Sequence, residues 1–402
     1  MNILYLIGNG FDLNLGLNTK LSHVIENIID EETDNSEILK LKERLIKNKD
    51  LWWSDFELQL GQHTKEFNPK TIDAYDNQYN YFVKKIKNLF EKQEKRINYN
   101  KDNNFLIART FMKQIITFYN YLPDTSKEIV INSMKNIYND DNIYYDFITF
   151  NYTSVLDNFV KCTKDIFKNN NSTPMPIISM KAVFHILRKI IHIYGTLEDG
   201  LILGVDNIEQ IANKRLSKIN FFIPKIIKQE TIKALGRNTT VEAMELIDNS
   251  NIIIAFGLSI GVTDKYWWNY IVNWLMKDND RQFILFIYND KIDTALNLTK
   301  LNTKEKAKTR LFSVLNKSIQ KKYNNYKDRI HFIFEQKNMF KIEDIFYSTR
   351  KDTYINNGSS NRFNLSHTLN NLVPNIGISS KAVKIMTPDV IKKFDDFFKK
   401  LP

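Results

Sequence analysis

The chain has 402 residues, 43% of them hydrophobic, so it can bury a large core in one elaborated domain or in up to three ordinary ones. Its single cysteine, Cys162, excludes a disulfide framework and a thiolate metal cluster, and fits a reducing cytoplasm. The net charge of +11 favours anionic partners, although lysine is spread along the chain, and the first apolar run is too short for a signal or membrane helix, so we expect a cytoplasmic protein with no membrane segment.

The chain begins with a strand signal and a glycine turn. Residues 3–7 are continuously apolar, which is typical of a strand buried on both faces of a parallel sheet. Gly8 and Gly10 follow, and they allow a ligand to approach the backbone closely, although Leu13 replaces the third glycine of the dinucleotide fingerprint. Besides a tight turn that only starts an α/β core, this pattern predicts a nucleotide site that comprises Gly8, Asn9, Gly10 and Asp12.

The remaining pattern alternates between helices and short strands. Apolar residues recur at intervals of three and four from 21 to about 135, which favours helices, and a further short helix is expected at 388–400. Short apolar runs predict strands at 144–150, 190–194, 201–203, 252–256, 283–288 and 330–334.

This order predicts an α/β fold with a Rossmann-like, doubly wound and mainly parallel sheet. The expected core comprises residues 1–20 and 141–346, with a large helical insertion, 21–140, between the first and second strands. Residues 347–402 are expected to form a C-terminal appendage.

Polar residues follow the predicted strands, where ligands of open parallel sheets bind. Thr149 and Asn151 end the second strand, and the carboxamide of asparagine suits ribose hydroxyls because it both donates and accepts. For Thr153 or Ser154 we favour capping of the next helix.

The third strand end offers a histidine and a tyrosine. Side chains two residues apart on a strand share a face, so His192 and Tyr194 are expected to point the same way beside Gly195. A strand histidine is often a hydrogen-bonded core residue, but a position next to a glycine turn points equally to catalysis.

The run after 252–256 repeats the logic of the first turn. Gly257 and Ser259 suit a phosphate. Asp264 either caps the helix that follows or holds a ribose.

Five short segments together carry a family resemblance: LIGNGFDLNLGL near the start, WWSDFE at 52–57, FITFNYT at 147–153, IHIYG followed by LILG, and FGLSIGVTD at 256–264. In this order, over roughly residues 1 to 290, they resemble the AbiH family of bacteriophage abortive-infection proteins. The same order is remotely similar to sirtuin-like domains, in which a glycine turn holds the NAD pyrophosphate, an asparagine orients the nicotinamide ribose and a histidine acts as base.

The sirtuin-like resemblance implies NAD as substrate or ligand, without a metal. The position of the histidine base is Tyr194 here, and tyrosine, with an ordinary pKa of about 10, is a poor base, so either His192 acts instead or the site binds without cleaving. The implied catalytic residues are Asn151, His192 and Tyr194. The implied nucleotide-binding residues are Gly8, Asn9, Gly10, Asp12, Thr149, Gly195, Gly257, Ser259 and Asp264.

The sequence therefore predicts an antiphage abortive-infection protein that binds NAD or a related nucleotide and hydrolyses its N-glycosidic bond. Such a hydrolase must stay inactive in a healthy cell, so we expect control by a homo-oligomer or a phage-derived trigger. A non-catalytic nucleotide sensor is one alternative, and a nucleic-acid-binding protein or nuclease is another.

The nucleic-acid alternative depends on two features. Trp52, Trp53, Asp55 and Glu57 offer stacking surface and two carboxylates, and a basic run extends from 300 to 329. We do not favour it, because Ser54 and Glu57 fit a capping box and a solvated helix face explains the basic run. Two-metal nuclease chemistry also needs more acids gathered in one place.

Overall fold

The computed structural model describes residues 1–137, 142–168, 184–287, 297–334, 339–342 and 345–347. Residues 348–402, including the helix expected at 388–400, lie outside the described residues. In the described chain a sheet of six parallel strands forms the centre: β1 (Asn2–Ile7), β2 (Asn142–Thr149), β3 (Phe184–His192), β4 (Ile252–Phe256), β5 (Gln282–Phe286) and β6 (Ile330–Ile333).

The strand order, β3-β2-β1-β4-β5-β6, confirms the expected Rossmann-like, doubly wound arrangement. The chain runs outward from β1 to β3 and then returns to β4 on the other side of β1, so the topological switch point lies between β1 and β4. Ile7 pairs with Thr149 on one side and with Phe256 on the other, which brings these strand ends to one edge.

One predicted strand is wrong. Residues 201–203 are buried but form no strand, and Ile202 N donates to Tyr194 O at 2.9 Å in a loop. An apolar run of three residues is explained by core packing alone, because burial does not require sheet pairing.

Helices form most of the rest of the described chain, and none of those described is both long and apolar enough to cross a membrane. The segment between β1 and β2 is helical, as its periodicity indicates. The helices are α1 (Gly10–Asn14), α2 (Leu21–Asp30), α3 (Ser36–Lys47), α4 (Lys49–Ser54), α5 (Phe56–His63), α6 (Ile72–Glu94), α7 (Lys101–Ile116), α8 (Asp124–Ile137), α9 (Val155–Lys168), α10 (Lys228–Ala234), α11 (Thr239–Asp248), α12 (Lys265–Met276), α13 (Asn297–Val314) and α14 (Lys317–Gln320).

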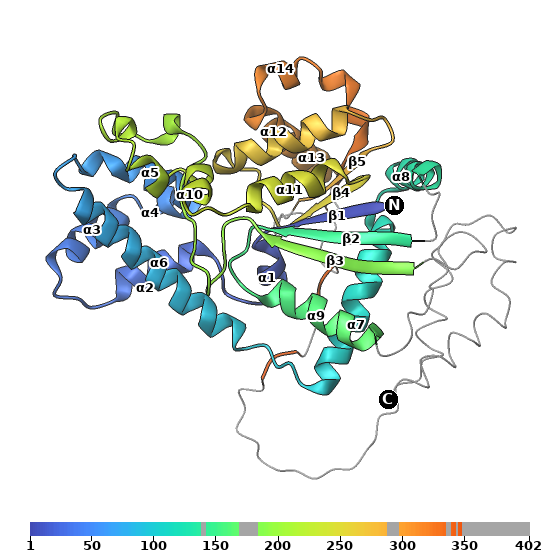
Figure 1. The fold of residues 1–402 in the computed structure, drawn as a ribbon, viewed down its shortest axis with the longest axis horizontal. Helices are drawn as coiled ribbons and strands as arrows, with labels where there is room; N and C mark the ends of the chain where they lie inside the picture. Colours follow the sequence, from blue (N-terminus) through green and yellow to red (C-terminus); the bar gives the residue numbers. More distant parts are fainter. Residues whose placement is uncertain (138–141, 169–183, 288–296, 335–338, 343–344, 348–402) are drawn as a thin grey trace, which may run out of the picture. The chain divides into compact units, whose positions relative to one another are not determined.

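Helices cover both faces of the sheet (Figure 1). On one face Tyr5 and Phe147 pack against Phe111 of α7 and Phe159 of α9 in a single apolar cluster. On the other face α11, α12 and α13 pack against alternate residues of the same strands. Alternation along each strand therefore divides the core into two layers.

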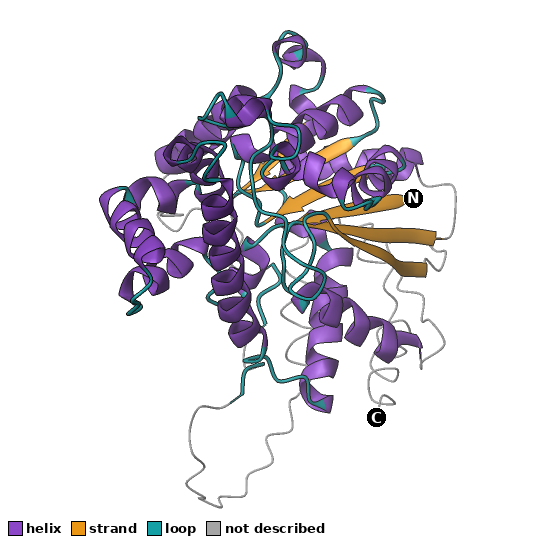
Figure 2. Ribbon diagram, turned by 60° about the vertical axis from the view of Figure 1, so that its left-hand side comes forward, coloured by secondary structure: helices purple, strands orange, loops and turns teal. Residues whose placement is uncertain are grey.

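A further group of helices lies at the carboxyl edge of the sheet. Figure 1 shows the arrowheads of β1, β2 and β3 pointing toward the side where α5, α6 and α10 lie, and Figure 2 shows helices at that end as well. Trp52, Phe56 and Phe82 contact one another there and join the apolar cluster that contains Tyr152 and Tyr194. The edge at which ligands of such sheets bind is therefore partly covered by protein.

Candidate functional site

The glycine turns after β1 and β4 lie directly against each other at the switch point. Gly8 N donates to Phe256 O and Gly10 N donates to Gly257 O, both at 2.9 Å. A Cβ on Gly8 would lie 2.5 Å from Gly257 O, and one on Gly10 would lie 2.4 Å from Gly257 Cα. Glycine is thus required for contact between the two turns, which engages two of the N–H groups expected to hold a phosphate.

The other polar residues of these turns differ in accessibility. Asn9 Nδ2 donates to Thr19 O at 2.8 Å, and Asn9 Oδ1 accepts from Thr19 Oγ1 at 2.6 Å, so this side chain fastens the turn to the segment before α2. Ser259 is exposed in the turn after β4. Solvent therefore reaches the switch point from the Ser259 side.

Asp12, in α1, joins the first two strand ends. Its side chain accepts a hydrogen bond from Asn151 Nδ2 at 3.2 Å and another from Thr153 Oγ1 at 2.7 Å. Thr149 Oγ1 accepts from Asn151 N at 3.1 Å, which fixes the turn after β2. The Thr153 hydroxyl thus donates to Asp12, and the expected cap of the next helix by Thr153 or Ser154 stays a prediction.

The Asp12 carboxyl of this network has a pKa close to neutral pH. Asp12 is 1% exposed, and burial raises its pKa to about 7, against the opposing hydrogen bonds of Thr153 and Asn151. Asn151 Oδ1 is buried and has no hydrogen-bond partner in the described part of the chain. A buried acceptor without a partner, next to a titrating carboxyl, suits a ligand that brings a hydroxyl.

His192 ends β3 at the same edge. Its Nδ1 lies 3.1 Å from Asn151 O and its Nε2 lies 2.9 Å from Asp157 Oδ2 on α9. Both neighbours only accept, so the ring donates from both nitrogens when it is protonated. Burial lowers the pKa of His192, but Asp157 and the Asn151 carbonyl outweigh burial and raise it overall.

The expectation that His192 and Tyr194 point the same way is wrong. The imidazole reaches α9, whereas the Tyr194 hydroxyl donates to Asp264 Oδ1 at 2.8 Å, before α12 on the opposite face. The strand ends at His192, so the two-residue alternation does not extend to Tyr194. Gly195 then turns the chain with a φ of +79°.

A buried lysine that the sequence reasoning missed lies beside Tyr194. Lys228 Nζ is 2.7 Å from Glu57 Oε2, 2.9 Å from Asp264 Oδ1 and 4.2 Å from the Tyr194 ring centroid. Its side chain is only 1% exposed. Burial lowers the pKa of Lys228, but Asp264 and Glu57 raise it by more than burial lowers it. The ammonium therefore stays charged. We call Glu57, Tyr194, Lys228 and Asp264 the lysine cluster.

Both carboxylates of the lysine cluster were assigned other roles from the sequence. Asp55, rather than Ser54, caps α5 by accepting from Leu58 N at 3.0 Å, so the predicted capping box is wrong and Glu57 pairs with Lys228. Asp264 precedes α12 but makes no side-chain cap. The signal for Lys228 was weak: it follows Ile226 and Ile227, but it is one lysine among many.

The structure gathers more acids here than the sequence showed. Asp55 and Asp206 interact electrostatically with the lysine cluster, and burial raises the pKa of each carboxyl. Nevertheless, in the described ranges no group of three or more His, Cys, Asp or Glu side chains is placed to hold a metal ion. Lys228 occupies the centre, so this arrangement is an ion-pair network.

A cavity of about 410 Å³ opens beside the end of β3. It is lined by His192, Gly195, Thr196, Asp199 and Arg237 among others. His192 is 12% exposed and therefore lies at the rim rather than deep in the core.

The sheet order and the polar strand ends at its switch point define a Rossmann-like α/β protein with a candidate ligand site at the carboxyl edge. The family model "Bacteriophage abortive infection AbiH" matches residues 4–288, so the chain belongs to this family of bacteriophage abortive-infection proteins. No curated protein matches the chain. The match extends from β1 through β5 and includes both the Asp12 network and the lysine cluster, while the sirtuin-like similarity stays a prediction.

Proposed function

We propose that this abortive-infection protein binds NAD or a related ribonucleotide at the carboxyl edge of the sheet and hydrolyses its N-glycosidic bond. The observation that carries the proposal is the pairing of Asp12, a buried carboxyl with a pKa of about 7, with Asn151, whose buried carboxamide oxygen has no partner among the described residues. A ribose hydroxyl donates to such an oxygen, and its own oxygen accepts from a neighbouring donor.

Each nearby side chain then has a distinct role. Hydrolysis of an N-glycosidic bond develops positive charge on the ribose, and water must lose a proton as it attacks. Asp12 is the proposed general base, because its pKa lies near neutral pH, and such a base contributes about 10²- to 10⁴-fold to the rate. The water proton passes to Asp12, the C–N bond electrons leave with nicotinamide, and ADP-ribose remains.

His192 and Tyr194 support this chemistry without acting as the base. When protonated, both His192 nitrogens donate to acceptors, so the ring positions the backbone of Asn151. Burial, followed by the charge of Asp264, raises the pKa of Tyr194 well above its ordinary value, so this phenol keeps its proton.

The test is nicotinamide release from NAD by the purified full chain. We expect Asn151→Ala and Asp12→Asn each to reduce release about 10²-fold or more, whereas Asn273→Ala, at an exposed position of α12, leaves it unchanged. The rate should rise with pH through about 7, as Asp12 loses its proton. NAD binding without release would support the sensor, and release that persists unchanged in both variants would refute the assignment of these residues.

A further inference from the structure

The phosphates of a bound nucleotide need a cationic or N–H-rich site, and the glycine turn is poorly placed to supply it. The N–H groups of Gly8 and Gly10 are engaged by Phe256 O at the end of β4 and by Gly257 O just after it. The helix that follows, α1, has only five residues, so its dipole contributes little. A nucleotide bound as proposed therefore needs another group near the switch point to contact its phosphates.

Arg310 of α13 is hydrogen-bonded to the turn after β4, next to the switch point. Its Nε donates to Ile260 O at 2.7 Å, directly after the exposed Ser259 in the turn that follows β4. This bond holds the guanidinium by one edge, and in the described chain no hydrogen bond engages its two Nη groups. Arg310 also interacts electrostatically with Asp55, which places it within range of the acids at the carboxyl edge.

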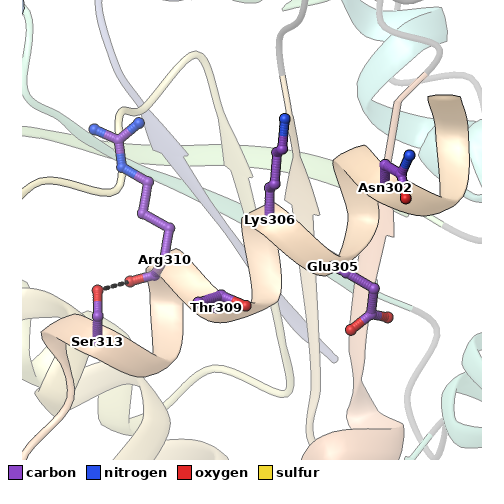
Figure 3. Close-up of a pocket in the computed structure, with 6 residues that line it drawn as sticks. All are labelled: Asn302, Glu305, Lys306, Thr309, Arg310 and Ser313. Carbon is purple, nitrogen blue, oxygen red and sulfur yellow. Dashed lines mark hydrogen bonds between the residues drawn. The ribbon is translucent and has the colours of Figure 1, made fainter.

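Lys306 lies one turn before Arg310, and Figure 3 shows both side chains rising from the same side of α13. A shallow surface hollow of about 470 Å³ lies over this exposed face of α13 and is lined by Asn302, Glu305, Lys306, Thr309, Arg310 and Ser313. The other charge and one hydroxyl of this lining are already paired: Glu305 with Lys308 at 2.7 Å, and Ser313 Oγ with Arg310 O at 2.7 Å. Within the described chain, the two cations, the Asn302 carboxamide and the Thr309 hydroxyl remain to contact a ligand.

We propose that Lys306 and Arg310 form a phosphate subsite for the diphosphate group of the nucleotide, and that the glycine turns only allow the two backbones to meet. An arginine held by Nε presents its two Nη groups as a fork that matches two phosphate oxygens. The inference rests on the proposed function in assigning the phosphates to a nucleotide, but the subsite recognises the diphosphate and not the glycosidic bond.

Calorimetric titration with ADP tests the subsite, because ADP carries the diphosphate but no nicotinamide. We expect Lys306→Met and Arg310→Met each to weaken ADP binding about 10-fold, as loss of a charge-assisted hydrogen bond does. Lys321→Met, at an exposed position beyond α14, serves as the matched control and should bind ADP like the wild type. With NAD, the same two variants should raise KM and leave kcat unchanged, because the phosphates do not react.

Arg310→Met also removes the bond to Ile260, so its melting temperature is measured beside that of Lys306→Met, which leaves that bond intact. Absence of ADP binding to the wild type, or equal ADP affinity in Lys306→Met and the control, overturns the subsite. Nicotinamide release with unchanged KM in both variants refutes the subsite alone. ADP binding that depends on both residues, without nicotinamide release, supports the subsite and refutes the proposed hydrolysis.

Discussion

Two carboxyl groups at the same edge of the sheet, the buried Asp12 and the mostly buried Glu57, are compensated in different ways. Among the described residues, Asp12 accepts hydrogen bonds from the neutral side chains of Asn151 and Thr153. Glu57 instead pairs with the Lys228 ammonium. Burial raises the pKa of both carboxyls, so in each case removal from water outweighs the partners.

This difference gives the two carboxyl groups different roles, catalysis for Asp12 and stabilisation of the fold for Glu57. Asp12 can lose or gain its proton without breaking an ion pair, which suits a group that takes a proton from water. Glu57 comes from α5 in the helical layer, and Asp264 comes from the edge of the sheet, so Lys228 joins the two parts. We expect substitutions in the Asp12 network to change activity most, and substitutions in the lysine cluster to change stability most.

The largest effect is expected when Lys228 is replaced. Lys228→Met removes a buried cation from Glu57 and Asp264, whose side chains are only 15% and 17% exposed, which should lower the free energy of unfolding by about 3–5 kcal/mol. Lys277→Met is the matched control, since Lys277 pairs with Asp248 at 2.6 Å while 54% exposed, and should cost less than about 1 kcal/mol.

Urea denaturation measures both variants. Adding Glu57→Gln to Lys228→Met should recover part of the loss, because one uncompensated charge disappears. If Lys228→Met and Lys277→Met lower the free energy of unfolding equally, the lysine cluster does not stabilise the fold more than a surface ion pair does.

The next effect concerns Asp12. The folded protein holds this proton up to a pKa of about 7, against 3.8 ordinarily, so its contribution to stability falls as pH rises between these values and stays low above them. Asp12→Asn has no proton to lose, and should therefore be more stable than the wild type at pH 8 by about 1–3 kcal/mol. At pH 4 the two should be nearly equal.

Urea denaturation at both pH values checks this difference, and Asp278→Asn, on the exposed loop after α12, is the control. A gain that is the same at pH 4 and pH 8 would exclude the buried charge as its cause. A variant that is more stable but inactive would be the expected trade-off at a site adapted to catalysis.

Much of the fold could be predicted from local pattern. The apolar runs at residues 3–7 and 252–256 have no polar positions, so they indicated buried parallel strands, and the structure places them side by side. Only a short apolar run was available for 201–203, and three apolar residues do not distinguish a strand from a buried loop.

The site was predictable only as far as the strand-end rule applies. That rule brings Asp12 and Asn151 to one edge, because parallel strands share the direction of their ends. It says nothing of Lys228, which reaches the site from α10 and makes its contacts through pairings across 171 and 36 residues. Such contacts depend on tertiary packing, for which neither spacing nor composition is a guide.

The contact of His192 with Asp157 also depends on tertiary packing, and the smallest effect is expected when this contact is removed. The Asp157 carboxylate helps to raise the pKa of His192, so Asp157→Asn should lower this pKa. An NMR titration that follows the imidazole signals of His192 measures the change. His185 provides an internal control, because burial lowers its pKa to about 4 and it does not contact Asp157.

The stability change should follow the raised pKa. A protonated histidine stabilises the fold below its unfolded pKa of about 6.5, and that contribution is lost as pH rises through the folded pKa. Because Asp157 is 40% exposed, we expect Asp157→Asn to cost only about 0.5–1 kcal/mol at pH 5 and almost nothing at pH 9. An unchanged His192 titration would mean that the Asn151 carbonyl alone holds the ring. In that case Asp157→Asn should leave nicotinamide release unchanged. If instead Asp157→Asn lowers the pKa of His192 and slows release, the His192–Asp157 ion pair helps to position Asn151.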